Sequence, residues 1–145
     1  MPEKHLVIKG GKPLFGNVVL HSAKNAFLPL LAAAVLTEKP VTISDCPFIT
    51  DVDGMVRILL SLGKKVNRNG RDITVLGKLS GNHVPEKLAC ALRSSVFLLG
   101  PLLSQTGEVK LHYPGGCAIG SRPLDIHLSG LSAMGAKVEY DEKGI

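Results

Sequence analysis

The sequence predicts an α/β protein with a mixed α+β fold, built from two copies of one repeated unit. Residues 26–43 and 94–111 share one pattern, and each reads as an apolar helix, a polar turn and a short strand. Residues 59–66 and 131–138 share a second pattern, a helix that ends at a glycine and is followed by a strand. Two matched pairs in the same order indicate a repeat in which helices and strands alternate.

The composition indicates a compact protein outside the membrane. The 145 residues are 45% hydrophobic, which suits a buried core. The longest apolar stretch, 26–36, contains Pro29 and is too short to span a membrane, and the amino end lacks the apolar run of a secretory signal. We therefore expect a cytoplasmic protein with no membrane partner. Cys46, Cys90 and Cys117 form no CxxC pair, so we also expect reduced thiols. Cys46 and Cys90 are interpreted as packing or loop residues.

The formal net charge of +5 favours an anionic partner. Four Phe, two Tyr and no Trp leave few platforms for stacking bases, so no nucleic-acid partner is expected. The five histidines have no metal-ligand spacing, so no metal is expected. The glycine-rich phosphate fingerprints are also absent. A small phosphorylated or carboxylated substrate is therefore the favoured class.

The first unit is expected at 22–81. Its first helix starts near Ser22, a preferred N-cap residue, and a short strand follows the polar turn. Its second helix ends at Gly63, and a strand opens three residues later. The turn Asn69-Gly70 then predicts a hairpin with a strand that starts at Asp72.

The second unit is expected at 82–145, with Gly135 ending its second helix and Val138 opening the next strand. The offset that carries 59–66 onto 131–138 carries the strand start at Asp72 onto Gly144. The sequence then stops just inside an expected strand. We therefore expect a truncated polypeptide with an exposed strand edge, through which copies could self-associate.

Residues 1–21 precede the first unit. Within them, 6–9 and 18–20 read as two short strands joined by a Gly/Pro turn. We expect these strands to belong to another layer.

The loop at 113–123 carries four extra residues relative to the first unit, because the second matched pair is offset further along the chain than the first pair. A repeat maintained for packing does not need a longer, glycine-rich, cysteine-bearing loop in one copy, so this loop is a candidate functional site. Cys117 follows Gly115-Gly116 and lies near Arg122, an arrangement that exposes a thiol beside a cation and favours proton transfer or nucleophilic attack. The alternative is that Cys117 is a small residue filling a turn.

Helix starts carry further groups that suit an anion. Lys24-Asn25 and Arg93 lie at nearly equivalent positions of the repeat, where backbone N–H groups and the helix dipole favour negative charge. Arg122 and Asp125 begin another helix and suit a phosphate and a hydroxyl of one ligand. The alternatives are solvated surface charges for Lys24 and Arg93, and a first-turn helix acid for Asp125.

Three segments carry a specific likeness to a known family: Ser22-Ala-Lys-Asn-Ala, Leu92-Arg-Ser-Ser and, above all, 114–131. Together they resemble UDP-N-acetylglucosamine 1-carboxyvinyltransferases, which are enolpyruvyl transferases. The resemblance implies repeated βαβαββ units of the inside-out barrel type, of which this chain holds about the first third, with residues 1–21 in the second domain. His21-Ser22 stand where that family usually has Ser-Gly.

The resemblance also implies a reaction. The family moves the enolpyruvyl group of phosphoenolpyruvate to the 3-hydroxyl of UDP-N-acetylglucosamine and releases phosphate, with no metal or organic cofactor. This is the first committed step of peptidoglycan synthesis, which implies roles in cell wall biogenesis, cell shape, cell division and the cell cycle. Because further catalytic residues of the family lie beyond Ile145 and its two domains close on the substrate, this chain alone is expected to have little or no turnover.

Carried over by position, the resemblance assigns Cys117 as the proton donor to the enolpyruvyl methylene carbon and as the thiol that epoxide inhibitors modify. Lys24 and Asn25 correspond to phosphoenolpyruvate contacts. The UDP-sugar side corresponds to Arg93, Arg122, Pro123, Leu124, Asp125 and Ile126.

Two other classes of function remain open. One is a non-catalytic binding module that kept the fold. The other is a basic nucleic-acid binder on related units, as in RNA phosphate cyclases, which the low aromatic content disfavours.

Overall fold

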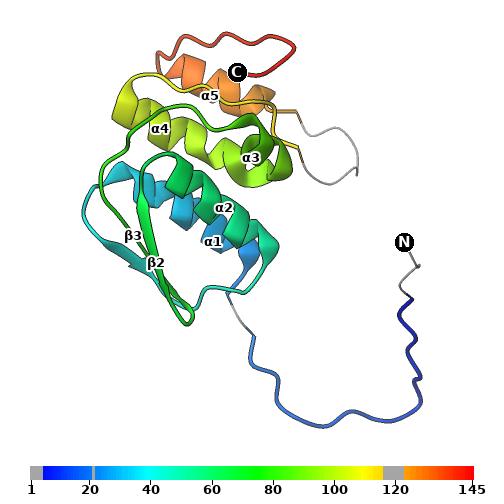
Figure 1. Ribbon diagram of the computed structural model, residues 1–145. Helices are drawn as coiled ribbons and strands as arrows, with labels where there is room; N and C mark the ends of the chain where they lie inside the picture. Colours follow the sequence, from blue (N-terminus) through cyan, green and yellow to red (C-terminus); the bar gives the residue numbers. More distant parts are fainter. Residues whose placement is uncertain (1–4, 21, 116–122) are drawn as a thin grey trace.

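The computed structural model describes residues 5–20, 22–115 and 123–145 (Figure 1). The first unit forms its expected elements in the expected order. They are α1 (Lys24–Ala33), the 3-10 helix η1 (Ala34–Leu36), β1 (Val41–Ile43), α2 (Thr50–Ser61), β2 (Lys65–Asn69) and β3 (Asp72–Leu76).

The three strands form one antiparallel sheet in the order β1-β3-β2. Gly70, with φ of 57°, supplies the left-handed conformation that the turn between β2 and β3 requires, so the predicted hairpin is confirmed. Gly63, with φ of 91°, follows the end of α2 as predicted. On β3, Ile73 and Val75 are fully buried and alternate with less buried neighbours, so one face of the sheet packs on the core.

A buried lysine ties together two chain segments at one end of this sheet. Lys64 is 3% exposed, and its Nζ donates to the carbonyl oxygens of Thr37 at 2.6 Å and of Gly77 at 2.7 Å. Burial lowers the pKa of the Lys64 ammonium from its usual 10.5. The chain entering β1 is thereby held to the chain leaving β3.

The second unit keeps its helices but forms only isolated bridges among the described residues. The helices are α3 (Glu86–Ala91), the 3-10 helix η2 (Arg93–Leu98), α4 (Leu99–Thr106) and α5 (Asp125–Ala133). The bridges pair His83 with Lys110 and His112 with Gly144. The short strand expected at the end of 94–111 forms only an isolated bridge, and the strand expected to open at Val138 is not formed, so both predictions are wrong for this chain. Its counterpart β2 pairs along the full length of β3, whereas here the segment equivalent to β3 comprises only Gly144 and Ile145.

The pairing that does form repeats the register of the first unit. Leu111 and Ile145 exchange two backbone hydrogen bonds of 2.8 Å. Their equivalents in the first unit, by the two offsets of the repeat, are Ile43 and Ile73, which are partners in the β1–β3 ladder. The repeat and its two offsets are therefore confirmed.

Residues 5–20 form neither helix nor strand, and in Figure 1 they run away from the helices and the sheet. Their side chains are exposed, Leu14 by 95% and Phe15 by 92%. The prediction of two strands here is wrong for this chain, because no strand of the described residues lies alongside to accept and donate their backbone hydrogen bonds. The assignment of residues 1–21 to another domain stays a prediction.

One core joins the two units. Helix α1 packs on η2 and η1 packs on α4, so equivalent helices of the repeat contact each other. Fully buried side chains come from both units, among them Leu31, Met55, Ile73, Leu98 and Leu102.

Candidate active site

The start of α1 places Lys24 beside the first turn of α2. Lys24 is the first residue of α1, and its Nζ lies 2.7 Å from Oδ2 of Asp51. The Lys24 side chain is 50% exposed, so the ion pair leaves part of the ammonium accessible. Asn25 follows in the first turn and is also exposed. The two residues assigned by resemblance to phosphoenolpyruvate thus lie together at a solvent-facing helix end.

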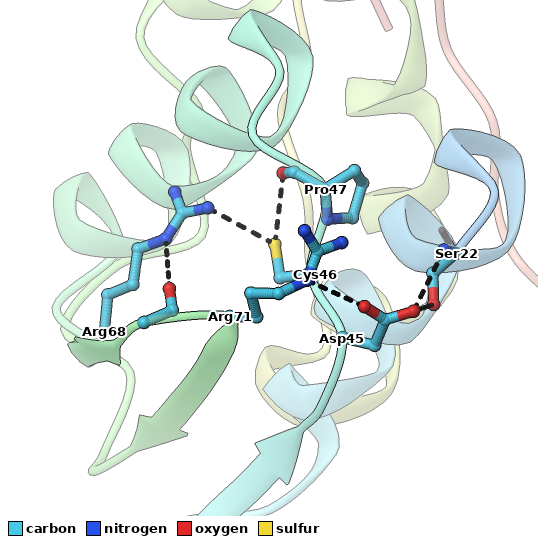
Figure 2. Close-up of polar contacts among 7 residues, drawn as sticks. Ser22, Asp45, Cys46, Pro47, Arg68 and Arg71 are labelled. Carbon is cyan, nitrogen blue, oxygen red and sulfur yellow. Dashed lines mark hydrogen bonds and ion pairs between the residues drawn. The ribbon is translucent and has the colours of Figure 1, made fainter. Parts of the chain in front are cut away.

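Ser22 does not cap α1, so that prediction is wrong. The N-cap residue is Ala23, and no side chain caps the helix. Ser22 instead donates to Oδ2 of Asp45, from its amide N–H at 3.1 Å and from its hydroxyl at 3.0 Å (Figure 2). As a cap the hydroxyl oxygen would accept from a backbone N–H, whereas here the hydroxyl donates to a carboxylate on the loop after β1, in a charge-assisted hydrogen bond.

Asp45 is held from its other side by the hairpin. Arg71, next to the turn glycine, donates from Nε to Oδ1 of Asp45 at 2.8 Å, and the Cys46 N–H donates to the Arg71 carbonyl oxygen at 2.6 Å. Asp45 has a φ of 59°, which is uncommon outside glycine. The hydrogen bonds from Ser22 and Arg71 lower the pKa of the Asp45 carboxyl from its usual 3.8, so the group is ionised at neutral pH.

Two arginines of the hairpin flank the exposed ring of Phe48. The guanidinium carbons of Arg68 and Arg71 lie 4.3 and 5.8 Å from the ring centre. Arg68 also pairs with Asp53 of α2 at 3.1 Å. Stacking and pairing together fix the hairpin tip against the loop that enters α2.

Cys46 is a packed thiol at this junction. It is fully buried, and its Sγ lies 3.5 Å from the Pro47 carbonyl oxygen and 3.9 Å from Nη2 of Arg68. Burial raises the pKa of the Cys46 thiol, so the sulfur stays protonated and unreactive at neutral pH. The interpretation of Cys46 as a packing residue is confirmed.

A cavity of about 270 Å³ lies between the start of α2 and the junction of α3 with η2. Asp51, which holds Lys24, lines one side, and Leu92, the neighbour of Arg93, lines the other. Arg93 is half-buried and begins η2. The cavity is therefore lined by the first turns of α2, by α3 and by Leu92, and Lys24 adjoins it only through its ion pair with Asp51. The full lining is Thr50, Asp51, Asp53, Gly54, Arg57, Leu88, Ala91 and Leu92.

The loop that leads to Cys117 begins against the end of α3. Cys90 Sγ lies 3.5 Å from the carbonyl oxygen of Tyr113. A Cβ on Gly115 would come within 1.6 Å of the Cys90 carbonyl oxygen, so only glycine allows this approach. Cys90 itself is exposed, and the interpretation of it as packed is wrong, because Ala89 is the one residue that this short helix buries.

Cys117 and Arg122 lie outside the described residues. Pro123 and Leu124 lead into α5, which begins at Asp125, and Ile126 is 82% exposed. Asp125 is thus a first-turn acid of α5, which agrees with the predicted helix start.

Within 5–20, 22–115 and 123–145, no group of three or more His, Cys, Asp or Glu side chains is placed to hold a metal ion. In the same residues, no helix has both the length and the apolar character needed to cross a membrane.

The sequence offered no functional role for three residues near the start of α1: Asp45, Arg71 and Asp51, the last of which lies close to the position that matches Asp125 in the repeat but lacks the glycine-rich loop. Asp51 had a visible signal, because it is an acid in the first turn of a helix in the same unit as Lys24. Asp45 and Arg71 had weaker signals, an acid at a strand exit and a base beside a hairpin turn. Their pairing joins segments 26 residues apart, which no local pattern reveals.

The fold is that of an enolpyruvyl transferase. The structure matches the crystal structure of the enolpyruvyl transferase NikO from Streptomyces tendae with a TM-score of 0.69 and 25% sequence identity, over 86% of this chain and 27% of that one. The family model of EPSP synthase (3-phosphoshikimate 1-carboxyvinyltransferase) matches residues 8–145. The chain belongs to this family.

Curated relatives carry a narrower name. The chain is 44% identical to UDP-N-acetylglucosamine 1-carboxyvinyltransferase 2 of Caldanaerobacter subterraneus subsp. tengcongensis, over 91% of this chain and 32% of that protein. It is 43% identical to UDP-N-acetylglucosamine 1-carboxyvinyltransferase of Vibrio atlanticus, over 98% of this chain and 34% of that protein. The chain spans about a third of the length of the curated relatives it matches.

Proposed function

We propose that this chain is the amino-terminal part of an enolpyruvyl transferase that moves the enolpyruvyl group of phosphoenolpyruvate to the 3-hydroxyl of UDP-N-acetylglucosamine. The observation that carries the proposal is the 44% identity, over 91% of the chain, to a transferase named for that sugar nucleotide. The reaction would serve peptidoglycan synthesis in the cytoplasm, and through it cell shape and division. Residues 1–21, 22–81 and 82–145 would be, in order, a strand segment of the second domain and two repeat units.

In this proposal the start of α1 binds phosphoenolpyruvate through Lys24 and Asn25. An accessible ammonium next to the unpaired N–H groups of a helix start suits a phosphate or carboxylate. Guanidinium groups, which grip phosphate oxygens with two parallel N–H donors, suit the diphosphate of the sugar nucleotide. That side consists of Arg93, Arg122, Pro123, Leu124, Asp125 and Ile126.

Cys117 acts as the proton donor. Its thiol proton passes to the methylene carbon of phosphoenolpyruvate, which leaves a cationic centre at the adjoining carbon, and the sugar hydroxyl oxygen attacks that centre as it loses its own proton. The tetrahedral adduct then loses a proton from the new methyl group together with phosphate, which restores the carbon–carbon double bond. Cations around the phosphate and the carboxylate stabilise the charge that develops.

Labelling with an epoxide inhibitor tests the role of Cys117. An acidic, accessible Cys117 opens the epoxide and adds one inhibitor mass to the intact chain, whereas buried Cys46 does not react. Cys90 is exposed, so Cys90→Ser and Cys117→Ser variants are compared. A single adduct that disappears only in Cys117→Ser supports the proposal. An adduct that disappears only in Cys90→Ser, or no adduct, favours the non-catalytic binding module.

Turnover by the chain alone is a second test. Closure of a second domain is part of the proposed cycle, and the chain spans about a third of its relatives, so phosphate release from the two substrates should stay at background. Release at a rate typical of an enzyme would contradict this part of the proposal.

A further inference from the structure

We propose that Asp45 is a positioning residue that couples the tip of the β2–β3 hairpin to the substrate-binding end of α1. The ligand, phosphoenolpyruvate, rests on the proposed function. The coupling itself rests on contacts that the structure contains, between segments that are far apart in the sequence.

Both oxygens of the Asp45 carboxylate are engaged, one by each neighbour. Oδ2 accepts the two hydrogen bonds from Ser22, and Oδ1 accepts the bond from Arg71. Figure 2 shows Asp45 between these two residues, with Ser22 just before the start of α1 and Arg71 in the turn of the hairpin. A shift of the hairpin tip is therefore passed through one carboxylate to the backbone of residue 22.

The backbone of Asp45 supports the same conclusion. Its φ of 59° lies in the left-handed region, which non-glycine residues adopt where surrounding contacts enforce it. The Cys46 N–H bond to the Arg71 carbonyl oxygen fixes the next residue to the hairpin. The loop after β1 is thus bent so that the carboxylate faces Ser22.

Helix α1 depends on this anchor because its own start is weakly defined. No side chain caps Ala23, and the preceding residues 5–20 form no regular structure. Lys24 pairs with Asp51, but an exposed ion pair contributes little. Phe27 and Leu28 hold the first turns of α1 in the core, and the two bonds from Ser22 to a charged acceptor hold the chain just before Lys24.

A fixed helix start matters for binding an anion. If Lys24 and Asn25 are already ordered, the ligand does not have to order them, and affinity rises without a new contact. Loosening Ser22 should weaken binding even though Ser22 itself is not a proposed ligand contact.

The test measures phosphoenolpyruvate affinity of the 145-residue chain from the amide NMR signals of Lys24 and Asn25. Asp45→Asn keeps a side chain that tolerates the left-handed φ but removes the charge, and should weaken binding about tenfold. Ser22→Ala should weaken it about threefold, and Ser22→Thr, which keeps the hydroxyl, should restore it. The matched control is Thr42→Ala, which removes a 2.9 Å hydroxyl bond to Thr74 elsewhere in the same unit and should leave affinity unchanged.

Two results would overturn the inference: unchanged affinity in Asp45→Asn and Ser22→Ala, or an equal loss in Thr42→Ala. If the unaltered chain binds no phosphoenolpyruvate, the proposed role of this helix end fails, and hydrogen exchange then decides the coupling. The amides of Ala26 and Phe27, which bond to the Ala23 carbonyl oxygen, should exchange several-fold faster in Asp45→Asn and unchanged in Thr42→Ala. Equal exchange in both variants would refute the anchor.

Discussion

The two repeat units bury equivalent residues to very different extents. Leu62, just after α2, is fully buried, whereas Met134, at the equivalent place after α5, is 78% exposed. Helix α2 buries four of its residues, and α5 buries none. Both helices were predicted from the same pattern, which covers only their last turns. What differs is the sheet, since α2 packs on β2, whereas the described residues form no strand beside α5.

The difference shows what completes a unit of this fold. In the first unit, Ile73 and Val75 of β3 fill the space beneath the helices. In the second unit, a broad cavity of about 1140 Å³ opens between α4, α5 and the residues that follow α5. In the first unit, β3 therefore supplies part of the core as well as the hydrogen bonds to β1 and β2.

The largest expected effect comes from truncating the equivalent residues Leu62 and Met134. Leu62→Ala leaves a void in a closed core and should lower the free energy of unfolding by about 3 kcal/mol. Met134→Ala should change it by less than about 0.5 kcal/mol, because that side chain is already in water. Urea denaturation of both variants measures the two values. Equal losses would show that α5 packs in solution as tightly as α2.

The glycines that end the second helices give the next comparison. Gly63 and Gly135 both have positive φ, 91° and 98°, so alanine is strained at either place. At Gly63 a Cβ would also lie 2.2 Å from Oγ of Ser80, whereas at Gly135 it would meet nothing within 4 Å. Gly63→Ala should cost about 3 kcal/mol and Gly135→Ala about 1 kcal/mol in the free energy of unfolding. A loss at Gly135 as large as at Gly63 would mean that a neighbour covers this site.

The first unit has two hydrogen bonds, both donated by Lys64, that no side chain can make at the equivalent position of the second unit. The residue equivalent to Lys64 there is Ala136, which has no side-chain donor. Lys64→Met leaves the carbonyl oxygens of Thr37 and Gly77 without this donor and should cost about 2 kcal/mol. Lys65→Met, at an exposed neighbouring position, is the matched control and should be nearly neutral. Thermal denaturation of the two variants measures the difference. An unchanged stability in Lys64→Met would show that the hydrogen bonds from Lys64 to Thr37 and Gly77 are dispensable.

The sequence predicted the parts of the fold that local signals specify. The apolar helix pattern, Gly63 and the Asn69-Gly70 turn located the first unit, and the offset of the repeat carried the start of its last strand onto Gly144. Strands were harder, because a strand exists only where a partner accepts its hydrogen bonds. The strand patterns at 6–9, 18–20 and Val138 found no such partner among the described residues.

The sequence likewise predicted only part of the candidate site. The register of the repeat placed Lys24 and Arg93 at helix starts, and in the structure a partner of Lys24, Asp51, and a neighbour of Arg93, Leu92, line one cavity. The capping role of Ser22 was wrong because Ala23 is the N-cap residue, and the Ser22 hydroxyl donates instead to a carboxylate 23 residues away. Contacts of that kind depend on the folded arrangement of β1 and the hairpin, which no short pattern contains.

The smallest expected effect concerns the pKa values of one carboxylate in each unit. Hydrogen bonds lower the pKa of Asp45 and of Asp141 below the usual 3.8, from Ser22 and Arg71 in the first case and from the Lys143 and Gly144 amides in the second. Each group therefore adds stability that is complete above about pH 4 and is lost as the pH falls through its lowered pKa.

Removing the Ser22 hydroxyl should change the pKa of Asp45 and not that of Asp141. Ser22→Ala should raise the pKa of Asp45 toward 3.8 and leave that of Asp141 unchanged, because Asp141 takes its bonds from its own turn. Carboxyl carbon NMR between pH 2 and pH 6, a window about two units either side of the usual value, measures both groups in one sample. An Asp45 pKa that does not move would show that the Ser22 hydroxyl does not stabilise the ionised carboxylate, which would contradict its part in the anchor to α1.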